Sequence, residues 1–161
     1  IVNIDGEHRT EPLFHTTFNE QNAEISPDGR WIAYQSDESG YEEIYVRPFP
    51  EINGGRWQIS VDGGTRPAWA RNGRELFYYL DPGKLMAVTI QPGSSFAASS
   101  PQVIFEGQYL SAPLVGRHYD VSPDGKRFLM LKDPQSAKRT TPNQLIVVLN
   151  WFDELTRLTR K

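Results

Sequence analysis

A segment of twelve residues that occurs three times is the strongest constraint on how this chain can fold. The copies read SPDGRWIAYQSD at 26–37, ARNGRELFYYLD at 70–81 and SPDGKRFLMLKD at 122–133. The glycines on which they align, Gly29, Gly73 and Gly125, stand 44 and 52 residues apart. Periods of this length are typical of folds that repeat one small supersecondary unit.

Each copy predicts two strands joined by a tight turn. Asp or Asn precedes each glycine, and both residue types favour tight turns because they tolerate positive φ and bond the local backbone. A short strand is expected before each turn, at 23–25, 67–69 and 119–121. A second strand leaves each turn, at 32–35, 76–79 and 128–131. The later two of these are apolar on both faces and therefore need cover on both faces.

Two further strands complete the predicted repeat. The third is expected at 43–46, 85–90 and 145–149, and the fourth at 57–60 and 103–106. Four antiparallel strands per repeat is the arrangement of a β-propeller blade. We therefore predict an all-β fold, a partial β-propeller of about three four-stranded antiparallel blades in one domain over 1–161. The repeats fall at about 20–60, 61–106 and 115–150. Three aromatic residues are expected to pack between blades: Trp31, Trp69 and Tyr78.

The two ends of the chain predict additional elements. Trp151, Leu155 and Leu158 recur at helical spacing, so a short C-terminal helix is expected over 151–161. Residues 1–4 and 12–16 are expected to be the last strands of a preceding blade. A propeller ring has typically four to eight blades, more than the roughly three predicted here. The chain is therefore predicted to be a fragment of a longer propeller, or a half-ring that two copies close as a homodimer.

These residues resemble the TolB-like β-propeller repeat family. The likeness rests on the turn unit SPDG with its four apolar positions, on SDESGYEEIYV at 36–46 and on SVDGGTRPAWARNGRELFYY at 60–79, and it covers roughly 20–150. The second copy departs from the pattern, because Arg71 and Asn72 replace Pro and Asp. The resemblance implies a bacterial interaction or sensory domain of the kind attached to protein kinases and regulators. It also implies an extracytoplasmic location, such as the periplasm.

Composition and motifs argue against several functions. Lys and Arg number 17 against 20 Asp and Glu, and the net charge of −3 argues against nucleic-acid binding. No apolar run approaches the roughly 18 residues of a membrane-spanning helix, so membrane insertion is not expected. The chain has no cysteine, no G-x-S-x-G, no H-E-x-x-H and no glycine-rich phosphate motif. We therefore expect no catalytic residue, no metal and no cofactor, and predict that the chain is not an enzyme.

Polar residues just before the first strand of each repeat form the first candidate site. Asn22, Arg66 and His118 occupy aligned positions, and Arg117 precedes His118. Loops that enter the innermost strands rim the central channel of a propeller, and binding residues favour loops on a rigid scaffold. These four residues are expected to bind a peptide or a small anion at the channel mouth. The alternative is a solvated rim without a ligand.

An aspartate eight residues after each aligned glycine forms the second candidate site. These residues are Asp37, Asp81 and Asp133. Their equal offset predicts equivalent positions in successive repeats, which favours an acidic arc for a cation or a basic partner. The alternative is a local role, since aspartate accepts backbone N–H groups at the start of a turn.

Three functions remain open on the sequence alone. The first is a non-enzymatic module that binds or senses a protein, peptide or other ligand. The second is an accessory or gating propeller of a larger enzyme, a peptidase or a protein kinase, whose catalytic domain lies outside these residues. Prolyl oligopeptidases carry similar gating propellers, and the resemblance includes them. The third is a purely structural half-ring. The repeat, the missing catalytic motifs and the polar rim favour the first.

Overall fold

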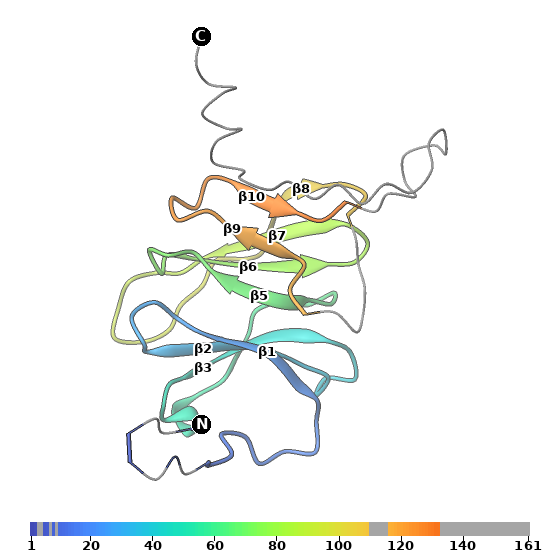
Figure 1. The fold of residues 1–161 in the computed structure, drawn as a ribbon. Helices are drawn as coiled ribbons and strands as arrows, with labels where there is room; N and C mark the ends of the chain where they lie inside the picture. Colours follow the sequence, from blue (N-terminus) through green and yellow to red (C-terminus); the bar gives the residue numbers. More distant parts are fainter. Residues whose placement is uncertain (3–4, 7, 9, 110–115, 133–161) are drawn as a thin grey trace.

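The protein is an all-β molecule whose strands form three antiparallel sheets (Figure 1). The computed structural model describes residues 1–2, 5–6, 8, 10–109 and 116–132. The first sheet has the order β1 (Glu20–Ile25), β2 (Trp31–Ser36), β3 (Glu43–Pro48) and β4 (Trp57–Gln58), with a 3-10 turn, η1 (Ile52–Gly54), before β4. The second sheet has the order β5 (Thr65–Trp69), β6 (Glu75–Leu80), β7 (Lys84–Thr89) and β8 (Gln102–Glu106). The third pairs β9 (Tyr119–Val121) with β10 (Phe128–Met130).

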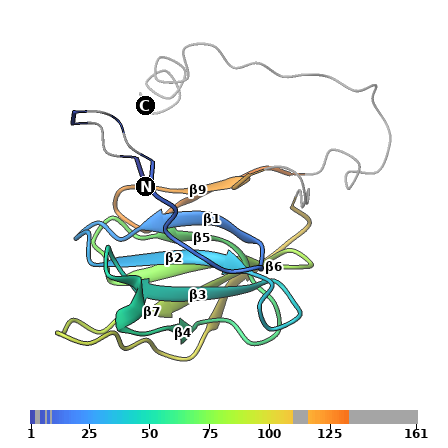
Figure 2. The same cartoon turned by 90° about the horizontal axis from the view of Figure 1, so that it is seen from below.

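The sheets are stacked in chain order, with their first strands on a common side. Figure 1 shows β1 to β3 at the bottom, β5 to β7 in the middle and β9 and β10 at the top, with β8 of the second sheet drawn level with β10. In Figure 2, β1, β5 and β9 lie at one edge of the stack and β4 at the opposite edge. One hydrophobic core fills the space between the first and second sheets, and another the space between the second and third.

The repeated segment builds the same hairpin three times, as its spacing predicts. Gly29, Gly73 and Gly125 have φ values of 72°, 68° and 70°. Each glycine N–H donates at 2.8 Å to the carbonyl three residues earlier. The preceding Asp or Asn side chain accepts the N–H two residues further on, at 3.1, 2.8 and 3.1 Å. The predicted turn chemistry is thus confirmed in all three copies.

The first and second strands of each repeat also pair in the same register. The Cα partners Glu24 and Ala33 in the first sheet correspond to Ala68 and Phe77 in the second. In the third sheet the corresponding pair is Asp120 and Leu129. These positions have equal offsets from the aligned glycines, so the sequence alignment is also a structural one.

Aromatic side chains fill the space between the first two sheets, as predicted. Trp69 and Tyr78 are buried in this core, and Trp31 is partly buried at its margin. The Trp31 ring meets Phe96 edge-on at 5.1 Å and Trp57 at 5.6 Å. These rings therefore serve packing, because neighbouring aromatic rings occupy their faces and edges.

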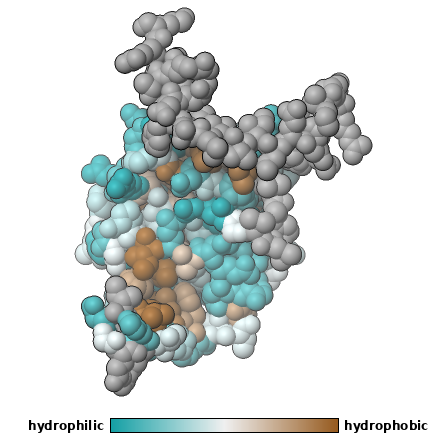
Figure 3. Space-filling model, in the orientation of Figure 1, coloured by the Kyte–Doolittle hydropathy of each residue, from teal (hydrophilic) through white to brown (hydrophobic). Residues whose placement is uncertain are grey.

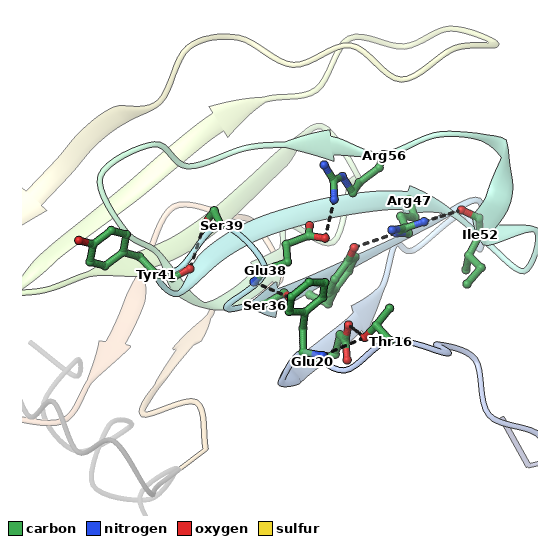
Figure 4. Close-up of polar contacts among 11 residues, drawn as sticks. Thr16, Glu20, Ser36, Glu38, Ser39, Tyr41, Arg47, Ile52 and Arg56 are labelled. Atoms are coloured by element: carbon green, nitrogen blue, oxygen red, sulfur yellow. Dashed lines mark hydrogen bonds and ion pairs between the residues drawn. The ribbon is translucent and has the colours of Figure 1, made fainter.

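The outer face of the first sheet is covered by the N-terminal segment. Tyr34 and Tyr45 are buried on this face. The Phe14 ring lies 4.6 Å from the Tyr34 ring, and the Arg47 guanidinium lies over Phe14 at 5.9 Å. Arg47 also donates Nε–H to the Tyr34 hydroxyl at 2.8 Å (Figure 4). This face is therefore packed within the chain itself.

The strand predicted at 12–16 is wrong. Residues 12–16 contain no strand, and Val2 pairs with Thr10 only as an isolated bridge. Pro12 has no N–H to give to a strand ladder. Phe14 instead packs across the face of the first sheet, which partly buries its ring without edge pairing.

The second strand of the third repeat also differs from expectation. Phe128 and Met130 pack into the second core, but Leu129 on the opposite face is 71 % exposed. The prediction that both faces of this strand are covered is therefore wrong within the described part of the chain. The strand expected at 145–149 and the helix expected at 151–161 lie outside the described residues.

Candidate functional site

A β-bulge interrupts the first strand of the first two sheets at the same place. In β1 the bulge lies at residues 22–23, and in β5 at residues 66–67. The first bulged residues, Asn22 and Arg66, have φ values of 50° and 55°. Asparagine tolerates this left-handed conformation, whereas arginine adopts it rarely and under strain. Bulges re-aim side chains and are common beside functional sites.

Gln35 of β2 connects the two bulges. Its Oε1 accepts a hydrogen bond from Asn22 Nδ2 at 3.0 Å and another from the main-chain N–H of Arg66 at 3.1 Å. Tyr119 of β9 donates its hydroxyl to the Arg66 carbonyl at 2.7 Å. The backbone at Arg66 is thus held by the first sheet on one side and by the third sheet on the other.

The first strands border a polar hollow of about 600 Å³. Its lining residues are Asn22, Ala23, Glu24, Pro67, Arg117, Tyr119 and Asp120. Figure 3 shows the molecule from the side on which β1, β5 and β9 lie, and on this face hydrophilic residues lie beside a smaller hydrophobic patch. The hollow therefore offers polar side chains from β1 and from residues 117–120 to a ligand, whereas the second sheet contributes only Pro67.

Arg117 is the centre of charge in this hollow. Its guanidinium forms an ion pair with Glu24 of β1 and lies 3.6 Å from a carboxylate oxygen of Asp120. It also lies over the Tyr119 ring at 5.9 Å. Burial raises the pKa of Glu24 above its usual value, although the neighbouring Arg117 opposes this shift. Two carboxylates surround one guanidinium, so the cation is already neutralised by its own neighbours.

Arg66 and His118 lie inside the molecule rather than on an open rim. Arg66 is 4 % exposed and His118 is 3 % exposed. The His118 ring meets Tyr79 edge-on at 4.7 Å, and neither ring nitrogen has a hydrogen-bond partner among the described residues. Burial lowers the pKa of His118, the charge of Arg66 lowers it further, and Asp81 opposes the shift. Of the four predicted rim residues, only Asn22 and Arg117 line the hollow.

Of the three predicted aspartates, the structure describes Asp37 and Asp81. Asp37 accepts the Asn19 N–H at 2.9 Å and Asn19 Nδ2 at 2.7 Å, and these bonds lower its pKa. These bonds join Asp37 to a residue 18 positions earlier in the chain, so they differ from the predicted role at the start of the following turn. Asp81 is exposed after β6, and Asp133 lies outside the described residues. No three His, Cys, Asp or Glu side chains in the described ranges come together as a metal site would require.

The polar lining residues Glu24, Tyr119 and Asp120 were not predicted, and neither was Gln35, which bonds the two bulges beside the hollow. Glu24 and Tyr119 sit within short strands, where the sequence pattern does not show which side chains face the centre. Gln35 could have been recognised from the sequence, because it is a polar residue within the mostly apolar strand WIAYQS. A buried polar side chain must find partners, so Gln35 was a candidate for a bridging role.

Comparison with known proteins adds no assignment. No family model and no curated protein matches this sequence. Within the described residues, no helix has the length and apolar character needed to cross a membrane.

Proposed function

We propose that the chain is part of a TolB-like β-propeller and acts as a non-enzymatic module that binds a protein or peptide partner. Three features support the propeller: consecutive antiparallel sheets stacked in chain order, first strands on a common side, and the same hairpin at the start of each sheet. Propeller blades repeat radially around a central channel. In this arrangement the hollow along β1, β5 and β9 is part of the channel wall.

The hollow is the observation that carries the binding role. Hydrogen bonds between sheets hold its walls: the Arg66 N–H donates to Gln35 Oε1, and the Tyr119 hydroxyl donates to the Arg66 carbonyl. Concave sites with a few fixed polar groups are the usual form of a ligand site. Because Glu24 and Asp120 already neutralise Arg117, the hollow suits the N–H donors of a peptide better than a small anion.

A peptide array probed with the 161-residue chain tests this proposal. We expect a subset of peptides to bind, and Glu24→Gln to weaken that binding roughly tenfold by removing a hydrogen-bond acceptor of full charge. Glu51→Gln is the matched control, because Glu51 is exposed and lies outside the hollow. The proposal is wrong if no peptide binds, or if the two variants bind the selected peptides equally.

The proposal also includes a second copy of the chain as a partner. The outer face of the third sheet exposes Leu129, whereas Phe14 covers the outer face of the first sheet. We therefore expect a homodimer to form through the third sheet, because association there would bury the exposed Leu129 side chain.

A further inference from the structure

A second pocket, which shares no lining residue with the hollow, opens where three connections meet. These are the loop between β2 and β3, the loop between β4 and β5, and the end of β6. The pocket has a volume of about 500 Å³. Its main side-chain contributors are Tyr41, Glu42, Val61, Asp62, Leu80 and Asp81. The first and second sheets both contribute to its walls.

Hydrogen bonds fix the loops that form this pocket. The Gly64 N–H donates to the Glu42 carbonyl at 2.8 Å, and the Gly63 N–H donates to Glu43 Oε1 at 3.0 Å. Glu43 is buried and also accepts the hydroxyl of Ser60. A side chain at Gly64 would meet Ser60 Oγ at 2.6 Å. The pocket is therefore shaped before any ligand arrives.

Large apolar side chains stand exposed at its edge. Tyr41 is 79 % exposed and Val61 is 72 % exposed. Figure 4 shows Tyr41 extending from the loop after β2, away from the ion pair of Glu38 and Arg56. Ser39 Oγ donates to the Tyr41 carbonyl at 3.2 Å and so fixes the base of this loop. Exposed apolar groups that gather around a concavity are a mark of interaction sites.

The charged side chains that line the pocket are all acidic among the described residues. Glu42, Asp62 and Asp81 contribute carboxylates, and no Lys, Arg or His of the described chain lines the pocket. Glu42 Oε2 is buried and has no hydrogen-bond partner among the described residues. Burial, together with the negative charges of Glu43 and Asp62, raises the pKa of Tyr78 to about 12. These carboxylates share the pocket with the exposed apolar side chains of Tyr41 and Val61, so the pocket suits an extended organic cation.

We propose that this pocket binds an arginine side chain presented by an extended segment of a partner protein. The guanidinium stacks on the Tyr41 ring, as arginine does on aromatic faces. Its methylene groups contact Val61 and Leu80, since long cationic side chains bury their stems against apolar surface. The carboxylates of Glu42, Asp62 and Asp81 accept its N–H groups, and such charge-assisted hydrogen bonds are short and strong. This site does not depend on the hollow or on the function proposed for it.

Titration with a blocked glycine–arginine–glycine tripeptide, followed by amide chemical shifts of the 161-residue chain, tests the proposal. We expect shifts confined to residues 41–43, 61–65 and 80–81. The same tripeptide with citrulline, which lacks the charge, is expected to bind about tenfold more weakly. Shifts at residues 22–24 and 117–120 would report the hollow instead, so the two sites are read separately.

Matched variants sharpen this test. Glu42→Gln with Asp62→Asn is expected to weaken tripeptide binding about tenfold, whereas the control Glu51→Gln with Glu106→Gln, of equal charge change, leaves it unchanged. Tyr41→Ala weakens binding about threefold and Tyr41→Phe does not. The proposal is overturned by absence of pocket shifts at about 50 mM tripeptide. Equal binding of the citrulline peptide, or displacement of the tripeptide by Ca²⁺, also overturns it.

Discussion

The Oε1 atom of Gln35 accepts the main-chain N–H of Arg66 at 3.1 Å, across the boundary between the first and second sheets. Both residues are buried, so water cannot replace this bond. We expect Gln35→Ala to lower the free energy of unfolding by about 2 kcal/mol, because the Arg66 N–H loses its acceptor. Urea denaturation measures this change. Gln91→Ala is the control at an exposed position. If both substitutions lower the free energy of unfolding equally, the bond from Arg66 to Gln35 does not stabilise the contact between the sheets.

The turn glycines give a second prediction. Gly29 has φ 72°, and a Cβ added there would meet no atom within 4 Å, so only its backbone conformation opposes a larger residue. Gly29→Ala is expected to cost about 1 kcal/mol in the free energy of unfolding. Gly116 has equal space but no positive φ, so Gly116→Ala is expected to be neutral. Thermal denaturation of both variants tests this, and a neutral Gly29→Ala would contradict it.

The hairpins were predictable because their determinants are local. A glycine with positive φ and an Asp or Asn before it specify the turn within a few residues. Apolar positions after Gly73 and Gly125 then mark the strands β6 and β10. The same reasoning wrongly predicted that Leu129 is covered. An apolar residue in a strand indicates that burial would be favourable, but it does not show that another element lies over it.

The candidate site was less predictable because its contacts are distant in sequence. The ion pair of Arg117 and Glu24 joins residues 93 positions apart. Arg66 was expected on an exposed rim, but the bulge and the Gln35 acceptor place it inside. Such placement depends on how whole sheets stack, and no pattern within one repeat encodes it.

The ion pair of Arg117 and Glu24 leads to a third prediction. Each side chain is about one-third exposed, so solvent screens the attraction. A double-mutant cycle with Arg117→Ala and Glu24→Ala is expected to give a coupling of about 0.5 to 1 kcal/mol, which falls at high salt. The more exposed pair Arg127 and Asp124, 3.5 Å apart, is the control and should give nearly none. Couplings of equal size would mean that the ion pair of Arg117 and Glu24 stabilises the folded chain no more than an exposed surface pair does.

Association of two copies gives the fourth prediction. Leu129 is exposed on the outer face of the third sheet, so light scattering should give a mass near twice the 18.3 kDa of one chain. Leu129→Glu places a charge at the interface and should return the mass to that of one chain. Val103→Glu is the control, since Val103 is also an exposed apolar residue, 51 % exposed against 71 % for Leu129, but lies on β8. A monomer at all concentrations, or a dimer that Leu129→Glu leaves intact, would exclude this interface.

The buried imidazole of His118 gives the fifth prediction, which concerns pH. Burial and the charge of Arg66 lower its pKa in the folded state, against an opposing effect of Asp81. As pH falls below about 6.5, the unfolded chain therefore takes up a proton that the folded chain does not, and stability falls by at most about 1.4 kcal/mol per pH unit. Above that pH His118 is neutral in both states and contributes no pH dependence. Urea denaturation between about pH 7.5 and pH 5 should show a smaller loss for His118→Phe, which keeps the ring contact with Tyr79, than for the parent chain. The exposed His15 is the control, and His15→Phe should retain the parent profile; identical profiles for all three proteins would show that His118 does not titrate differently on folding.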